Sequence, residues 1–218
     1  MLAKLISSTI IGVSGHLVTV EVDVSQRGFP SFSIVGLANK SIEEAKERIR
    51  SAITNSGFQM PECRITVNLA PADIPKVGSG FDLPMALGLL IGNGVIKLDL
   101  IEGKLIMGEL SLNGTIKPVK GVIPAIKEAK EQGISEIIIP YENGEEAALI
   151  PSVSIVPVRS LLELVNHLTA KKRIVSQVRT EKIIAGTAGN DFNSVFGQHQ
   201  TKRALEIAAA GFHNIHMK

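Results

Sequence analysis

The chain has 218 residues, of which 44% are hydrophobic, and its formal net charge is +2. It contains one Cys, one Tyr and no Trp, which excludes an intrachain disulfide and requires a mainly aliphatic core. No apolar run approaches the ~18 residues of a membrane span, and polar residues interrupt the apolar amino terminus, which predicts a buried strand rather than a signal peptide. We therefore expect a cytoplasmic protein of one or two domains, without a membrane partner.

Residues 1–170 alternate between patterns that are typical of strands and of helices. The clearest strand is 17–24, where valines alternate with polar residues in the way a half-buried strand requires. Further strands are predicted at 31–37, 63–70, 105–112, 114–119, 136–140 and 153–158, and helices at 41–57, 82–94, 122–132 and 160–170. Asn113-Gly114 predicts a hairpin between the strands on either side of it. The order of elements predicts an α/β (α+β) fold.

Three polar residues near predicted helix starts have candidate roles. Ser41 can cap the helix 41–57, with Glu44 in the capping-box position. Asp82 follows a loop at 71–80 that is rich in Pro and Gly, and we expect its carboxylate to cap the next helix, with a contact to a partner or DNA as the alternative. Lys76, in the same loop, is expected to face solvent, with phosphate binding as the alternative.

The last 28 residues resemble the beginning of a module that is not finished. Asp191 to Gly197 reads DFNSVFG, a helix is predicted over 201–210, and 214–217 begins a strand. A helix with an apolar side and an unpaired strand cannot bury themselves in so few residues. We therefore expect the chain to be a fragment of a longer protein, and docking of these residues on the preceding domain is the alternative.

The charge is distributed unevenly along the chain. Residues 1–170 carry 15 basic and 18 acidic side chains, whereas residues 171–218 carry 8 and 3. The basic excess begins at Lys171-Lys172-Arg173. Residues 171–190 are predicted to be a basic linker, either solvated or in contact with a phosphate backbone.

Three passages in residues 1–170 carry a resemblance to a known family. They are FSIVGLANKSIEEAKERIRSAI, NLAPADIPKVGSGFDLPMALGLL and GELSLNGTIKPVKGVIPAIKEAKEQGISEIIIP. These passages resemble the amino-terminal domain of magnesium-chelatase-like AAA+ proteins, the family of ComM and YifB. The resemblance implies a Lon protease-like fold of the ribosomal S5 domain 2 type. Carried over from Lon peptidases, the catalytic serine position falls on Gly80 and the lysine position on Ile123, so the domain is expected to be non-catalytic.

The segment 191–218 resembles the first part of an AAA+ ATPase module. In that family a short turn backs the adenine of ATP, and Val195, Phe196, Gly197 and Gln198 match this turn. The phosphate loop GxxxxGK[ST], whose amides and lysine hold nucleotide phosphates, occurs nowhere in the sequence. The chain itself is therefore expected to hydrolyse no ATP. The resemblance implies a longer parent that uses ATP and Mg²⁺, forms a homo-oligomeric ring such as a hexamer, and acts on DNA by branch migration in natural transformation and recombination.

Two other functions are compatible with the sequence. A Lon-type peptidase would need Ser79 and Lys120 to act as the pair, although each is displaced from the expected position. A nucleic-acid-binding module without a motor is the second. His199, His213 and His216 do not form a closed set of metal ligands with Cys or carboxylates, so no metal site is predicted.

Overall fold

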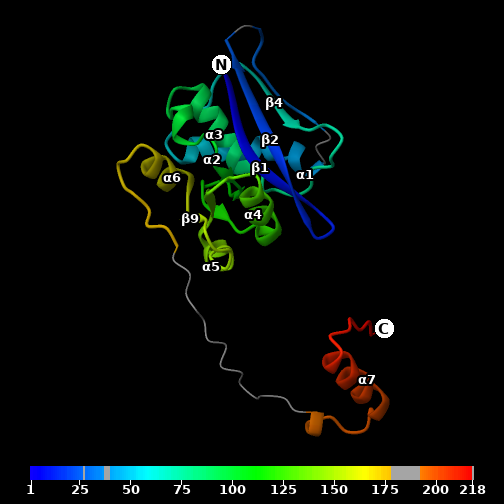
Figure 1. The fold of residues 1–218 in the computed structure, drawn as a ribbon. Helices are drawn as coiled ribbons and strands as arrows, with labels where there is room; N and C mark the ends of the chain where they lie inside the picture. The colour runs from blue at the N-terminus through cyan, green and yellow to red at the C-terminus, as the bar shows by residue number, and fades with distance from the viewer. Residues whose placement is uncertain (27, 37–39, 178–191, 218) are drawn as a thin grey trace. The chain divides into compact units, whose positions relative to one another are not determined.

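The computed structural model describes residues 1–26, 28–36, 40–177 and 192–217. The chain divides into two compact units, residues 1–180 and residues 181–218, which we describe separately (Figure 1). Among the described residues, every helix is too short or too polar to cross a bilayer.

A mixed sheet of seven strands organises the first unit, in the order β3-β4-β2-β1-β5-β8-β9. These strands are β1 (Leu2–Ile11), β2 (Ser14–Ser25), β3 (Ser31–Val35), β4 (Arg64–Ala70), β5 (Leu105–Ile106), β8 (Glu136–Pro140) and β9 (Ser154–Val158). A separate two-stranded hairpin contains β6 (Glu109–Leu110) and β7 (Ile116–Lys117). The α-helices are α1 (Lys40–Glu43), α2 (Ala45–Asn55), α3 (Asp82–Gly92), α4 (Val122–Glu131), α5 (Gly144–Ala147) and α6 (Leu161–Leu168), and the 3-10 turns are η1 (Leu98–Leu100) and η2 (Tyr141–Asn143).

The pairing changes direction across the sheet. β1 and β2 form a long antiparallel hairpin, whose register runs from Leu2 opposite Asp23 to Ile11 opposite Ser14. β4 continues it as the antiparallel neighbour of β2, whereas β3 pairs with β4 in parallel and β5, β8 and β9 extend the other side in parallel. The alternation of Val18, Val20 and Val22 with polar residues matches this arrangement, because alternate side chains of a strand point to opposite faces.

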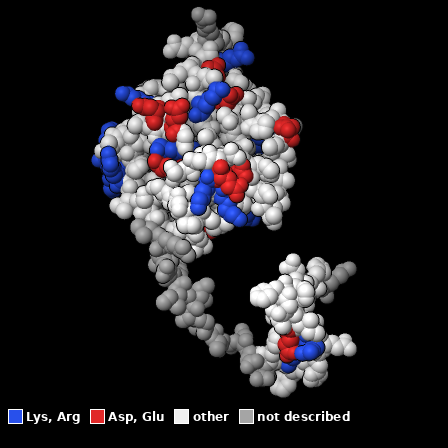
Figure 2. All heavy atoms as spheres, viewed as in Figure 1, with Lys and Arg blue, Asp and Glu red and all other residues white. Residues whose placement is uncertain are grey.

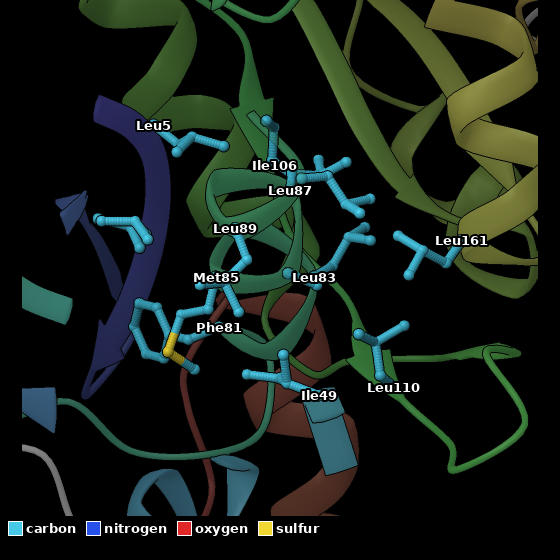
Figure 3. Packing of buried hydrophobic residues seen from close by; sticks show 14 of the residues in the cluster. Leu5, Ile49, Phe81, Leu83, Met85, Leu87, Leu89, Ile106, Leu110 and Leu161 are labelled. Carbon is cyan, nitrogen blue, oxygen red and sulfur yellow. The ribbon is translucent and has the colours of Figure 1, made fainter. Parts of the chain in front are cut away.

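Helices cover both faces of the sheet and enclose two apolar cores. One core contains side chains of α2, α3 and α6 together with β1, β2 and β4. The other contains side chains of α4 and α5 together with β5, β8 and β9. Figure 3 shows the first core around α3, where Leu5 of β1, Ile106 of β5 and Leu161 of α6 surround the helix. A helix that is apolar on every side belongs in the interior, and α3 is buried from Asp82 to Ile91.

Two glycines let α3 lie very close to β2. A Cβ added at Gly88 would stand 2.4 Å from Val22 Cγ2, and one at Gly92 would stand 2.4 Å from Val24 Cγ2. Real Cβ atoms do not approach other carbons so closely, so any larger residue would push the helix and the strand apart. These glycines therefore fix the distance between the buried helix and the central strands.

Most predicted elements of residues 1–170 are confirmed, with small shifts at their ends. The helix predicted over 41–57 is divided at Glu44 into α1 and α2, so the prediction of Ser41 as a helix cap is wrong: Ser41 lies within α1. The predicted strand 105–112 is also divided, because β5 joins the main sheet while β6 turns away to pair with β7 around Asn113-Gly114. Ser160 caps α6 by accepting a hydrogen bond from the Glu163 amide at 3.2 Å.

The second unit contains the 3-10 turn η3 (Phe192–Ser194) and the helix α7 (His199–Ala210). The helix prediction over 201–210 is confirmed. Residues 214–217 are described but form no strand, so that prediction is wrong for this structure. A strand needs a hydrogen-bonded neighbour, and none pairs with these residues within the described part of the chain. Phe196 and Phe212 of this unit are each 97% exposed.

Candidate functional site

The loop at 71–80 and the start of α3 occupy the place where the family resemblance puts a peptidase centre. Backbone hydrogen bonds hold this loop against the segment between β5 and β6. The Gly108 amide donates to the Gly80 carbonyl at 3.0 Å, and the Leu83 amide donates to the Gly108 carbonyl at 3.0 Å. The Asp82 amide donates to the Ser79 carbonyl at 3.1 Å and closes the turn that begins the helix. The position of Ser79 and Gly80 is thus fixed by main-chain contacts.

Asp82 is paired with Arg48 of α2 inside the protein. Its side chain is 1% exposed and accepts from Arg48 Nε at 2.8 Å and from the second guanidinium arm at 3.1 Å. The Leu110 amide of β6 also donates to its Oδ2 at 3.2 Å. The prediction that Asp82 caps α3 is therefore wrong: Phe81 holds the N-cap position, and the carboxylate points to another helix and to the hairpin. Burial likewise removes it from contact with a partner or DNA.

Burial and ion pairing shift the pKa of Asp82 in opposite directions. Burial raises the pKa of Asp82 to about 6, although hydrogen bonds from Arg48 and from the Leu110 amide favour the carboxylate. The hydrogen bond to Asp82 raises the pKa of Arg48, so the guanidinium stays charged. At neutral pH the pair is mostly ionised, and removal of either side chain would leave the other as a charge without its partner, which destabilises the folded protein.

Ser79 has a carboxylate as its neighbour. Its hydroxyl donates to Glu109 Oε2 of β6. Lys120 is exposed in the turn before α4. A Ser79–Lys120 peptidase requires a hydrogen bond between these two side chains, and among the described residues the hydroxyl of Ser79 is bonded to Glu109 instead. A carboxylate that accepts a hydrogen bond from the hydroxyl orients the serine, but it does not replace the deprotonated lysine of a Ser–Lys pair.

The two positions that correspond to the peptidase serine and lysine lie on neighbouring segments. A Cβ added at Gly80 would stand 3.7 Å from Val119 Cγ1, in the turn that leads to α4, and Ile123 is the second residue of that helix. Asn143 holds the turn, because its side chain accepts from the Val119 amide at 2.9 Å and donates to the Val119 carbonyl at 3.0 Å. The scaffold brings the two segments together, but glycine and isoleucine supply neither a nucleophile nor a base.

Lys76 is buried beside this loop, so the prediction that it faces solvent is wrong. Its ammonium group donates to the Pro71 carbonyl, and Thr9 Oγ1 donates to the adjoining Pro75 carbonyl at 3.3 Å. Burial lowers the pKa of Lys76, although the charge of Asp73 opposes the shift. A side chain with no exposed surface is also not available to bind a phosphate in this arrangement.

Sequence reasoning missed the roles of Arg48, Glu109 and Asn143. Each acts on a residue more than 20 positions away in the chain. The helical pattern of 41–57 placed Arg48 outside the apolar side, and nothing near it indicated a buried carboxylate partner.

In the second unit, the residues proposed to back adenine form the turn before α7. Val195 is 45% exposed and Phe196 is 97% exposed. Gln198 has a left-handed backbone with φ of 53°, its carbonyl accepts from the Lys202 amide at 2.9 Å, and its side chain accepts from Thr201 Oγ1 at 3.3 Å. The turn is therefore well formed, while its apolar side chains remain uncovered by the described residues.

No cluster of three His, Cys, Asp or Glu residues suited to a metal ion occurs in the part of the chain that the structure describes. His213 and His216 are exposed in the second unit.

A basic hollow of about 320 Å³ lies in the first unit, where α6 is followed by residues 171–177. Arg159 stacks over the ring of Tyr141 at 3.4 Å, and Lys172 and Arg173 line the same hollow with one acid, Glu163. Elsewhere, on the face seen in Figure 2, basic and acidic side chains of the first unit are interspersed. Three of the four charged side chains that line the hollow are therefore basic.

Residues 171–177 form a strap over the edge of the sheet. The Lys172 amide donates to the Asn166 carbonyl at 3.1 Å, the Ile174 amide to His167 Nδ1 at 2.9 Å, and the Gln177 amide to the Ile155 carbonyl at 2.9 Å. Burial lowers the pKa of His167, although the charge of Glu136 opposes it, and the neutral ring can accept this bond. The first seven residues of the predicted linker are therefore held on the first unit, whereas 178–190 lie outside the described residues.

Two family descriptions match the chain. Subunit ChlI of Mg-chelatase matches residues 20–143, and magnesium chelatase, subunit ChlI, matches residues 191–218. The chain belongs to the magnesium chelatase ChlI family. Among curated members of related sequence, competence protein ComM of Haemophilus influenzae is 39% identical over 218 residues, and YifB of Salmonella typhimurium is 38% identical over 205 residues.

The ChlI-family chain covers only part of these relatives. The alignments include 98% and 94% of this chain but 42% of ComM and 40% of YifB. Lon protease 2 of Bacillus subtilis is 31% identical over 192 residues, which are 78% of this chain and 34% of that protein. The mixed α/β first unit is therefore a Lon-like fold, as the resemblance implied.

Proposed function

We propose that residues 1–170 are the non-catalytic accessory domain of an AAA+ ATPase that acts on DNA. In this proposal residues 171–190 connect that domain to residues 191–218, which begin the ATPase module of a longer protein. The proposal is supported by the resemblance, which carries the peptidase serine and lysine positions onto Gly80 and Ile123, and by the contact of Gly80 with the turn that leads to the helix of Ile123. Such a scaffold can position partners without cleaving them.

Val195, Phe196, Gly197 and Gln198 are proposed to back the adenine of ATP once the module is complete. The exposed apolar side chains of Val195 and Phe196 support this role, because adenine sites are largely apolar. The residues of this chain do not fit ATP and Mg²⁺ as a whole, since the sequence supplies no phosphate loop. In this proposal nucleotide, Mg²⁺ and a homo-oligomeric ring, such as a hexamer, belong to the complete parent.

We also propose that the parent promotes branch migration in natural transformation and recombination, in the cytoplasm. The related ComM of Haemophilus influenzae is a competence protein by name, which supports a role in that process. Arg159, Lys172 and Arg173 in the basic hollow support contact with a phosphate backbone at the end of the first unit.

Binding of a fluorescent DNA oligonucleotide to the full chain, followed by anisotropy over a range of salt concentrations, tests the DNA contact. The double variant Lys172→Glu/Arg173→Glu should bind more weakly. The plot of the logarithm of its binding constant against the logarithm of salt concentration should be less steep, by the amount that corresponds to about two phosphate contacts. Lys117→Glu/Lys127→Glu makes the same change of charge at exposed positions outside the hollow and should retain most of the affinity. Equal loss in both double variants would reduce the contact to general charge attraction.

A Ser–Lys peptidase is the second candidate, favoured by the similarity to Lon protease 2. A serine-reactive fluorophosphonate probe distinguishes it from the accessory domain. Labelling that disappears in Ser79→Ala would establish the peptidase. We expect no labelling, because the Ser79 hydroxyl donates to Glu109 and no lysine activates it.

A further inference from the structure

The two edges of the seven-stranded sheet differ in whether another segment covers them. At one edge, the strap covers β9: Gln177 forms a β-bridge with Ile155, and the hydroxyls of Ser176 and Ser154 lie 3.1 Å apart. At the other edge is β3, which pairs only with β4 within the described part of the chain. An open edge presents unpaired amides and carbonyls that can template another strand.

The register identifies which backbone groups of β3 are unpaired. The Ser31 amide donates to the Cys63 carbonyl at 3.3 Å, and the parallel register continues with Ser33 opposite Thr66. Bonds to β4 therefore use Ser31, Ser33 and Val35, and the amides and carbonyls of Phe32 and Ile34 point away from the sheet.

β3 also lacks the features that usually protect an edge. The segment Ser31–Val35 contains no charged residue and no proline, and three of its five residues are exposed. Phe29, just before the strand, is 92% exposed. Proteins commonly block such edges with charge, proline or a covering segment, as the strap does at β9. The open edge is consistent with a surface that takes up a partner.

A groove of about 450 Å³ runs beside this edge. Apolar lining comes from Phe32 of β3, from Met60 and Cys63 of the loop between α2 and β4, and from Ile65 of β4, while Arg50 and Thr54 of α2 form the opposite wall. A strand edge flanked by a helix is the arrangement with which proteins bind an extended peptide, because the edge bonds its backbone and the groove takes alternate side chains.

The charges of the groove restrict the peptide further. Arg50 is exposed, and none of the described carboxylates lies within ion-pair distance of it. Glu62 is the only acid among the lining residues. A peptide with a carboxylate near Arg50 would gain a charge-assisted hydrogen bond that a neutral peptide lacks.

We infer that the β3 edge and the groove beside α2 bind an extended peptide segment of a partner protein, with apolar side chains at alternate positions and a carboxylate that reaches Arg50. The peptide adds a strand to β3 through the outward amides and carbonyls of Phe32 and Ile34. This inference uses neither the basic hollow nor ATP, so it stands apart from the proposed DNA contact.

A phage-displayed library of random twelve-residue peptides, panned against the full chain, supplies the probe. We expect an enriched family with alternating apolar residues and one acidic position. A synthetic peptide of that family should slow hydrogen exchange at the amides of Phe32 and Ile34, which are free to exchange in the unbound chain. Failure to enrich such a family, or protection at another surface, overturns the inference.

Variants test the charge and the groove separately. Arg50→Glu should weaken binding about ten-fold or more, and a peptide with Lys in place of its acid should bind this variant better than the original. Thr54→Trp should block the groove. Arg64→Glu is the matched control, because Arg64 lies opposite Ser31 in the register, points to the other face of the sheet and does not line the groove. Concentration-dependent dimers that Arg50→Glu or Thr54→Trp dissociates would assign the edge to a second copy instead.

Discussion

Replacement of Arg48 by methionine tests the pairing of Arg48 with Asp82. Methionine retains much of the length of the side chain and removes the charge and both hydrogen bonds to the carboxylate. Asp82 then stays buried at 1% exposure with only the Leu110 amide as a partner. Removal of one partner from a buried ion pair lowers the free energy of unfolding by about 3 to 5 kcal/mol. Because Arg48 is 23% exposed, we expect a loss at the lower end of this range, about 3 kcal/mol at neutral pH.

The loss should depend on pH in a defined direction. The pKa of Asp82 is raised in the folded protein from 3.8 to about 6, so the folded state holds a proton that the unfolded state has released. The free energy of unfolding of the wild type therefore falls by about 3 kcal/mol as the pH rises from 3.8 to about 6, and this loss is constant at higher pH. Without the guanidinium the pKa of Asp82 rises further, and each additional unit adds about 1.4 kcal/mol of destabilisation above the wild-type pKa.

Urea unfolding of the full chain, followed by far-UV circular dichroism from about pH 5 to about pH 8, measures this effect. At about pH 5 the carboxyl is largely protonated in both proteins, and Arg48→Met should lose only about 1 kcal/mol for the missing hydrogen bonds. The difference from wild type should widen as pH rises. In the double variant Arg48→Met/Asp82→Asn the widening should disappear, because no group remains to ionise. A difference that stays constant or narrows towards high pH would refute a buried, desolvated Asp82.

Three further outcomes follow from the structure. Gly88→Ala should destabilise the chain by about 1 to 3 kcal/mol in the same urea assay, although alanine favours helices, because its Cβ would stand 2.4 Å from a valine of β2. Gly80→Ser should be nearly neutral, since its Cβ has 3.7 Å of clearance, and Gly80→Ser/Ile123→Lys should gain fluorophosphonate labelling that neither single variant has. Lowering the pH below about 6.5 should reduce the protection of residues 174–177 against hydrogen exchange, measured relative to the intrinsic exchange rate at each pH, because burial lowers the pKa of His167, its neutral ring accepts a strap amide, and protonation removes that acceptor.

The fold could be predicted from sequence where a local pattern determines the element. The period-two valines of β2 and the continuous apolar run of α3 leave few alternatives, since each pattern suits only one way of burying its side chains. Boundaries were less certain where a segment changes partners. The region 105–112 reads as one strand, but β5 joins the main sheet and β6 pairs with β7, a choice made by long-range contacts that no local pattern records.

The candidate site was predictable in its scaffold but not in its charges. The glycines and prolines around residues 71–80 indicated the loop, and the structure places Gly80 beside Val119, in the turn before the helix that contains Ile123. The burial of Lys76 and the pairing of Asp82 were not predictable, because an acid at a helix start or a lysine in a glycine-rich loop is usually exposed. Only the packing of α2 and the hairpin against α3 supplies the partners that make those positions possible.

The buried pair also bears on how the loop at 71–80 is held in place. Arg48 of α2 and the Leu110 amide of β6 converge on one carboxylate at the first turn of α3, so three elements meet at the segment that follows Gly80. If the positions of these elements did not matter, an apolar residue at position 82 would avoid the cost of burying an ionisable group, which raises the pKa of Asp82 to about 6 despite the hydrogen bonds from Arg48 and the Leu110 amide. The charged pair instead fixes the relative positions of α2, α3 and the β6–β7 hairpin, because its bidentate geometry tolerates little displacement. The same helix α2 forms one wall of the groove beside β3, so the pair that ties α2 to the start of α3 also positions the surface to which we assign peptide binding.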